Sequence, residues 1–208
     1  MRKILLITLV LVVIGFAIYA LFFASDPRRI KNYPSFGTRV IAFGDSLIEG
    51  VGASEGNDFI SLLSQKLATP IENYGRGGDT TATALERLPR VLEEVPNPKV
   101  VIILLGGNDF LRKIPKEETF ANLSTIIESF QERDAVVLLL GIRGGIFKDN
   151  FEKEFEELHD IYQTAYISNV LRGLITNRKL MFDSIHPNDA GYKKIADKVY
   201  PILKEISQ

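Results

Sequence analysis

The sequence predicts an α/β domain, with a mostly parallel sheet between two helical layers in a three-layer α/β/α sandwich. Short apolar segments typical of buried strands alternate along the chain with longer segments of helical periodicity. Such alternation is typical of right-handed βαβ units. Residues 39–208 are long enough to form one domain with a sizeable core.

Five segments carry the strand pattern and five carry the helix pattern. The segment Lys99–Leu105 is apolar at every position after its lysine, which is typical of a central strand buried on both faces. In a parallel sheet, ligands bind beyond the carboxyl ends of the strands. The strands are expected at Arg39–Phe43, Ile71–Tyr74, Lys99–Leu105, Ala135–Leu140 and Ala165–Ile167. The helices are expected at Phe59–Leu67, Thr81–Glu94, Glu117–Arg133, Asn150–Gln163 and Asp189–Ile206.

The first strand is followed directly by Gly44–Leu47, of sequence Gly-Asp-Ser-Leu. Two glycines, Gly50 and Gly52, come next, and an amphipathic helical pattern follows them. Ser46 is therefore expected at the end of a rigid strand, on a turn into a helix, close to oriented backbone N–H groups. A hydrolase places its nucleophile in such a position.

A general base for this serine must be one of the two histidines. His159 ends a charged helical pattern and is expected to be solvated. His186 lies three residues after Asp183, in a loop that Pro187 keeps out of a helix. One short loop can then present both groups, with Asp183 accepting from Nδ1–H and Nε2 left to take the serine proton. The alternative is that Asp183 and Asn188 are ordinary turn and cap residues.

Two further loops offer hydrogen-bond donors for an oxyanion. The loop Gly75–Thr80 has glycine at three of its first four positions, so its backbone can approach a ligand closely. The third strand ends in Gly106–Asp109, which contains Asn108. The candidate donors are the Gly78 N–H, the Asn108 carboxamide and the Ser46 N–H. Any one of these loops alone would be a plain turn, but each of them follows a strand.

Taken together and in order, these blocks resemble the SGNH (GDSL) hydrolase superfamily, and within it the bacterial thioesterase I, lysophospholipase and arylesterase group. The resemblance covers roughly residues 39–206 and implies a flavodoxin-like fold. It implies that Ser46 is the nucleophile and that Asp183 and His186 are the orienting acid and the base. It also implies that Gly78 and Asn108 are oxyanion donors beside the Ser46 N–H.

Other catalytic motifs are absent from the sequence. There is no G-x-S-x-G elbow, which disfavours the α/β-hydrolase form of the triad. No P-loop pattern occurs, and the glycines at 50–56 do not have the spacing of a dinucleotide fingerprint. With no cysteine and only two histidines, we expect no metal site and no cofactor. A net charge of −1 argues against a nucleic-acid partner.

The N-terminal region predicts a position at a membrane. Arg2 and Lys3 precede Ile4–Ala24, which carries no charge and would be about 31 Å long as a helix, close to a bilayer core of about 30 Å. We interpret residues 1–24 as an uncleaved transmembrane anchor; the alternative is a cleaved signal peptide, which would release the protein. A linker is expected at residues 25–38 and the hydrolase domain at 39–208. We expect the catalytic domain outside the cytoplasm, either periplasmic or extracellular.

Three functional hypotheses follow. The first is a membrane-tethered serine esterase or thioesterase that acts on acyl esters such as lysophospholipids. Its candidate acyl-contacting loop is the glycine-hinged Ile142–Phe147, for which the alternative is a simple surface loop. The second is a carbohydrate O-acetyl esterase that uses the same residues on envelope polysaccharide. The third, disfavoured by the complete set of candidate residues, is a non-catalytic binding domain. The sequence leaves the oligomeric state open.

Overall fold

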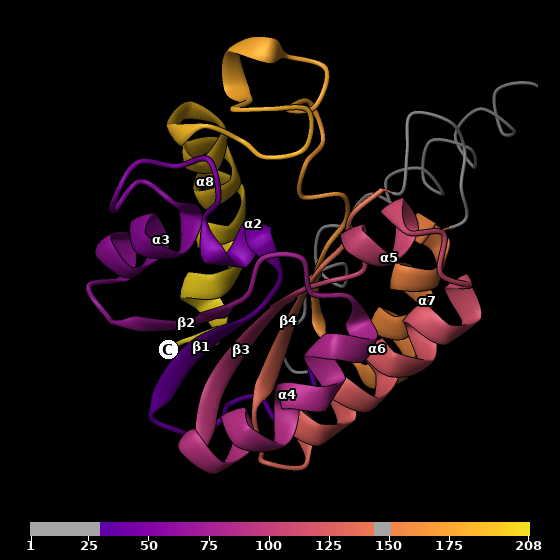
Figure 1. The fold of residues 1–208 in the computed structure, drawn as a ribbon. Coiled ribbons are helices and arrows are strands. Elements are labelled where there is room, and N and C mark those ends of the chain that lie inside the picture. Colours follow the sequence, from indigo (N-terminus) through magenta and orange to yellow (C-terminus); the bar gives the residue numbers. More distant parts are fainter. Residues whose placement is uncertain (1–29, 144–150) are drawn as a thin grey trace, which may run out of the picture.

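The computed structural model describes residues 30–143 and 151–208 (Figure 1). At its centre is a five-stranded sheet of order β2-β1-β3-β4-β5, in which every neighbouring pair of strands is parallel. The predicted α/β fold with a parallel sheet is thereby confirmed. The strands are β1 (Arg39–Gly44), β2 (Ile71–Gly75), β3 (Pro98–Leu104), β4 (Val136–Leu140) and β5 (Ala165–Ile167).

Helices cover both faces of the sheet (Figure 1). Helices α3 and α8 pack together on one face, whereas α4, α6 and α7 form a packed row on the other. The short helices α2 and α5 begin just beyond the carboxyl ends of β1 and β3. The bounds are α2 (Ser46–Glu49), α3 (Phe59–Leu67), α4 (Thr81–Glu94), α5 (Gly107–Leu111), α6 (Lys116–Gln131), α7 (Phe151–Tyr162) and α8 (Asp189–Ile206), with a 3-10 helix at Arg178–Leu180.

The core lies between the sheet and its two helical layers. Strand β1 is buried from Val40 onward, and β4 is buried over its whole length. Phe43 of β1 meets Phe130 of α6 edge-on at 5.5 Å between ring centroids, which joins the sheet to one helical layer. Within the other layer, Phe59 of α3 stacks on Tyr192 of α8 at 6.1 Å. The strand that leads to Ser46 is therefore supported by the core on both faces.

The element boundaries agree with the sequence prediction to within two residues. Helices α3, α4 and α8 and strand β5 span the predicted residues, and the others differ by one or two positions. The exceptions are α2, where the sequence predicts only a turn, and α5, which it does not predict. With four and five residues, these helices are too short for helical periodicity to show in the sequence.

The segment before β1 is bound to the domain at the amino ends of the strands. The Lys31 N–H donates to the carbonyl of Gln163, just before β5, at 2.9 Å. The Asn32 carboxamide donates to the carbonyl of Ala135, just before β4, at 3.0 Å. The chain therefore enters the domain at the amino ends of the strands, whereas Ser46 lies beyond their carboxyl ends.

Some sequence predictions fall outside the described residues. These are the anchor at 1–24, the first part of the linker at 25–29, and positions 144–147 of the loop expected to contact an acyl chain. Among residues 30–143 and 151–208, no helix has both the length and the apolar character needed to cross a bilayer.

Candidate active site

Ser46 is the first residue of α2, immediately beyond β1. The carboxylate of Asp45 caps this helix by accepting from the Leu47 N–H at 3.0 Å. Gly50 ends the helix in the left-handed conformation, with φ 94°, and its N–H donates to the Ser46 carbonyl at 3.0 Å. Because a single helical turn is not stable alone, the caps and the strand together hold the serine in place.

Gly44 is required where β1 approaches β3. A Cβ at this position would lie 2.3 Å from the Leu104 carbonyl oxygen and 2.5 Å from a side-chain carbon of Ile48. Any larger residue would push α2 away from the sheet. The glycine of the Gly-Asp-Ser-Leu segment thus allows the helix to start directly at the strand end.

The structure joins three of the predicted site residues in one hydrogen-bonded chain. The distance from Ser46 Oγ to His186 Nε2 is 3.0 Å, and the distance from His186 Nδ1 to Asp183 Oδ2 is 2.8 Å. The other carboxylate oxygen of Asp183 accepts from the N–H groups of Ile185 and His186, both at 2.7 Å. Asp183 therefore acts as a turn residue and as the partner of the imidazole at the same time.

These hydrogen bonds keep Asp183 ionised. The backbone N–H of His186, followed by its side chain and the Ile185 N–H, lowers the pKa of Asp183 to about 2. Any contribution of this group to stability is fully present above about pH 4 and is lost as the pH falls through about 2. Asp183 is thus charged at every pH at which the imidazole can serve as a base.

The neighbouring Asp45 behaves in the opposite way, because it is buried. Its side chain is 3% exposed, and this burial raises its pKa to about 7, although the Leu47 N–H and the charge of His186 act against the rise. A carboxyl group next to the nucleophile therefore changes charge near neutral pH.

We expect Asp45→Asn to change how stability depends on pH. Between about pH 4 and 7 the folded wild type holds a proton on Asp45 that the unfolded chain has lost, so wild-type stability falls as the pH rises across this range. Asparagine keeps the cap acceptor and does not titrate. Circular dichroism would give the melting temperatures of both proteins from pH 4.5 to 8. The wild-type melting temperature should fall with rising pH relative to that of Asp45→Asn. The control is Asp160→Asn, at an exposed position, whose melting temperature should change with pH in the same way as that of the wild type. If Asp45→Asn behaves like this control, the raised pKa of Asp45 is wrong.

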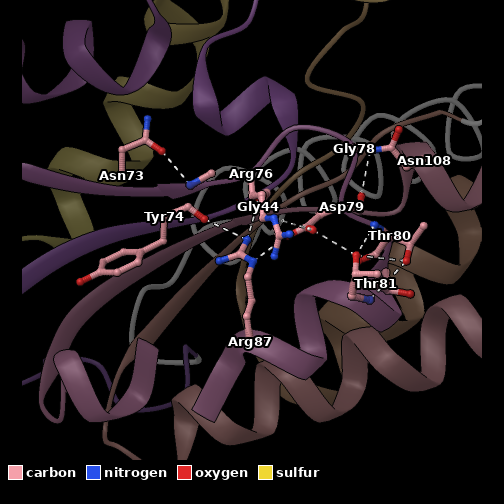
Figure 2. Close-up of polar contacts among 12 residues, drawn as sticks. Gly44, Asn73, Tyr74, Arg76, Gly78, Asp79, Thr80, Thr81, Arg87 and Asn108 are labelled. Atoms are coloured by element: carbon pink, nitrogen blue, oxygen red, sulfur yellow. Dashed lines mark hydrogen bonds and ion pairs between the residues drawn. The ribbon is translucent and has the colours of Figure 1, made fainter. Parts of the chain in front are cut away.

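The Asn108 carboxamide is held beside Gly78 (Figure 2). Its Nδ2 donates to the Asp79 carbonyl at 2.8 Å, which leaves the second N–H of the amide available. Gly78 has φ +80°, which favours glycine, and its carbonyl accepts from Arg112 at 2.9 Å. Within residues 30–143 and 151–208, no acceptor takes the backbone N–H of Ser46 or of Gly78.

The candidate donors lie at neighbouring strand ends. Ser46, Gly78 and Asn108 follow β1, β2 and β3, which are adjacent in the sheet order β2-β1-β3. His186 is brought to the same edge by the loop before α8. The other histidine, His159, lies in the last turn of α7, where its Nδ1 is 2.7 Å from the Thr164 carbonyl.

Sequence reasoning missed two polar residues next to this edge, one buried and one partly buried. Asp109 is fully buried and accepts from the Thr81 N–H and hydroxyl at 2.9 and 2.6 Å, which ties α5 to the start of α4. Arg87 lies on the inner face of α4 and pairs with Asp79. The available signal was an arginine three residues after Ala84 and four before Val91, a spacing that places it on the apolar face of the helix.

Comparisons with known proteins identify the family of this chain. Residues 42–194 match the model of the GDSL-like Lipase/Acylhydrolase family. The esterase TesA of Pseudomonas aeruginosa is 30% identical over 178 residues, which cover 80% of this chain and 88% of TesA. A thioesterase 1/protease 1/lysophospholipase L1 of Escherichia coli is 29% identical over 76% of this chain and 79% of its own.

A solved structure also resembles this chain. The crystal structure of TesA superposes with a TM-score of 0.74 at 30% identity, covering 81% of this chain and 99% of that one. The fold similarity to TesA comes from the comparison, and the hydrogen-bonded Ser46, His186 and Asp183 come from this chain. Both are consistent with an enzyme that hydrolyses esters. The chain is an ester hydrolase and belongs to the GDSL-like lipase/acylhydrolase family.

Proposed function

We propose that the protein cleaves acyl esters and thioesters through an acyl-enzyme formed on Ser46. The observation that carries this proposal is the continuous hydrogen-bonded chain from Ser46 Oγ through His186 to Asp183. A nucleophile bonded to a base, which is itself oriented by a third group, is the arrangement required for covalent acyl transfer.

The reaction has two steps. His186 Nε2 takes the hydroxyl proton as Ser46 Oγ attacks the carbonyl carbon, while Asp183 holds the imidazole and stabilises its positive charge. The imidazolium then protonates the leaving alcohol or thiol, and the acyl group remains on Ser46. A water molecule deprotonated by His186 attacks this ester, releases the acid and restores the serine.

The negative charge that develops on the carbonyl oxygen needs donors already in place. We assign this role to the N–H groups of Ser46 and Gly78 and the second Nδ2–H of Asn108. The Ser46 N–H is at the first position of α2, where a helical N–H has no acceptor within its helix. The partial positive charge of that helix end favours an anion there.

We expect Asn108→Ala to lower kcat by about 100- to 1,000-fold with little change in KM, because the donor acts mainly in the transition state. The measurement is steady-state hydrolysis of p-nitrophenyl butyrate. Asn57→Ala is the matched control, since the Asn57 carboxamide is exposed and bonds only within its own loop. A kcat within threefold of wild type would remove Asn108 from the oxyanion site.

Exposed apolar side chains around the triad favour an acyl substrate. Phe182 is 68% exposed and Ile185 41% exposed, and both belong to the loop that carries Asp183 and His186. On the other side, Phe110 and Leu111 follow Asn108 in α5 and are exposed as well. A hydrocarbon chain that covers such side chains is stabilised by about 25 cal/mol per Å² of apolar surface removed from water.

An open cavity of about 650 Å³ begins at the same loop. Phe182, Ser54 and Asp189 are among the residues that line it, and the Asp189 carboxylate accepts from the Ser54 N–H at 2.7 Å. The volume is within the range of small-molecule sites. Neither Ser46 nor His186 lines it, so we assign the cavity to a distal part of the substrate and not to the reacting ester.

The chain length of the preferred acyl group separates the lipid hypothesis from the carbohydrate alternative. The test is hydrolysis of p-nitrophenyl esters from C2 to C16, with Ser46→Ala as the blank. We expect activity on esters of C8 or longer, and cleavage of a palmitoyl thioester. Activity on the acetyl ester alone would favour the O-acetyl esterase, and activity on none of them the non-catalytic domain.

We further propose that the protein is held at a membrane, with its catalytic domain outside the cytoplasm. The support is the uncharged segment Ile4–Ala24. Retention of the full-length protein in the membrane fraction after carbonate washing would support the anchor, and recovery of a shortened soluble protein would favour the cleaved signal peptide.

A further inference from the structure

A buried ion pair lies directly beneath the loop that carries Gly78 (Figure 2). Arg87 Nε donates to the Asp79 carboxylate at 2.6 Å, and the two side chains are 16% and 4% exposed. Arg87 is on α4, on the face that includes the buried Ala84, Leu88 and Val91. An ion pair in such a place is costly to desolvate, so its geometry and its further hydrogen bonds decide what it contributes.

The rest of the Arg87 guanidinium binds the ends of two strands. One terminal nitrogen donates to the Gly44 carbonyl of β1 and the Tyr74 carbonyl of β2, both at 3.0 Å. The group lies 4.3 Å from the centroid of the Phe43 ring. A single side chain thus connects the strand that leads to Ser46 with the strand that leads to the Gly78 loop.

Asp79 is linked to both of the other candidate oxyanion donors, the Gly78 N–H and the Asn108 carboxamide. It follows Gly78 directly, so holding its side chain holds the Gly78–Asp79 peptide, whose Gly78 carbonyl also accepts from Arg112 at 2.9 Å. The Gly78 N–H lies on the other side of the Gly78 Cα, separated from this held peptide by the backbone rotations of that one residue. The Asp79 carbonyl accepts from Asn108 Nδ2 at 2.8 Å, and its carboxylate also accepts from the Thr83 hydroxyl at 3.1 Å. The donors of β2 and β3 are therefore both positioned through one residue, and Arg87 sets the place of that residue relative to β1.

We propose that Arg87 is a positioning residue for the oxyanion hole. It does not touch the substrate; it fixes the Gly78 N–H and the Asn108 carboxamide relative to the Ser46 nucleophile by joining Asp79 to the carbonyls of Gly44 and Tyr74. This inference rests on the function proposed above.

Arginine is the residue that this geometry requires. Its planar guanidinium presents donors in fixed directions and can bond a carboxylate and two carbonyls at once, whereas a lysine ammonium acts as a point charge. Lysine would restore the pair with Asp79 but not the simultaneous hydrogen bonds to the Gly44 and Tyr74 carbonyls. Since a misplacement of about 1 Å can cost about 100-fold in rate, a small loosening of the Asp79 loop should be visible in kcat.

The first test compares Arg87→Met with Arg90→Met, a matched control on the same helix whose side chain is 83% exposed and pairs with Glu94. With p-nitrophenyl butyrate we expect kcat of Arg87→Met to fall about 10- to 100-fold, with KM within threefold of wild type. Arg87→Lys should lie between the two, and Arg90→Met should match wild type. Circular dichroism checks that each variant is folded at the assay temperature.

The second test asks whether Arg87 acts through the oxyanion donors. If it does, Asn108→Ala should cost much less in an Arg87→Met background than in wild type, because the donor is already misplaced. Asp79→Asn/Arg87→Met removes both buried charges together and should recover thermal stability while kcat stays at least about tenfold low. A purely structural role predicts instead that kcat recovers with stability.

The proposal is overturned if folded Arg87→Met has kcat within twofold of wild type. It is also overturned if the fold loss in kcat of the double variant Arg87→Met/Asn108→Ala equals the product of the losses of the two single variants. Should Arg87→Met not fold, the same criteria apply to Arg87→Lys. These outcomes are distinct from failure of the proposed function. If Ser46→Ala is inactive and Arg87→Met is fully active, only the positioning role falls.

Discussion

Replacing Ser46 by alanine is expected to lower kcat for p-nitrophenyl butyrate by about 10⁵- to 10⁶-fold, to the level left by binding and the oxyanion donors alone. Ser46 Oγ lies 3.0 Å from His186 Nε2, and among residues 30–143 and 151–208 no other hydroxyl is hydrogen-bonded to this nitrogen. Alanine removes that atom and leaves the Asp45 cap and the Gly50 end of α2 unchanged. Folding should therefore be preserved, which circular dichroism can confirm.

Ser129→Ala is the matched control, because this serine lies on the exposed side of α6 and its hydroxyl donates only to the Thr125 carbonyl. It should keep wild-type activity. Substantial hydrolysis by Ser46→Ala would show that the ester is cleaved without this nucleophile. The acyl-enzyme mechanism would then be wrong.

A loss of similar size is expected for His186→Ala, since a nucleophile and its base act as one unit. Without Nε2, nothing accepts the serine proton as the bond to carbon forms. Activity should drop by about 10⁵-fold at pH 7.5 and rise with hydroxide concentration, which replaces the base in part. The measurement is the pH dependence of kcat/KM for both proteins.

The second histidine of the chain provides the control. His159 bonds to the Thr164 carbonyl and stacks on Tyr166 at the far end of α7, away from the carboxyl ends of the strands. His159→Ala should keep full activity and lose some stability. Equal losses in both variants would point to general damage to the fold and would contradict the assignment of His186 as the base.

Most of the fold was predictable because its signals are local. The strands of a parallel sheet are continuous apolar runs, and each helix shows its own periodicity, so the bounds agree to within two residues. The helix α2 could not be found in this way. Its four residues are helical because Asp45 and Gly50 cap them and because Gly44 lets them start at the strand end.

The candidate site was predictable where its residues sit in short motifs. Ser46, Gly78, Asn108, Asp183 and His186 are each close to a glycine or proline turn after an apolar run or before a helix. The contacts that hold these residues in position were not predictable, because they involve residues distant in the chain. Arg87 reaches back 43 positions to the carbonyl of Gly44. The raised pKa of Asp45 likewise comes from burial, which no local pattern records.

The most direct test of the central claim is to map the site of covalent attack. The full-length protein would be treated with a fluorophosphonate, digested and analysed by tandem mass spectrometry, with Ser46→Ala and His186→Ala treated in parallel. We predict a single adduct on Ser46 in the wild type, none in Ser46→Ala and greatly slowed labelling in His186→Ala. An adduct on another residue, or no adduct on the folded protein, would contradict the assignment of Ser46 as the nucleophile.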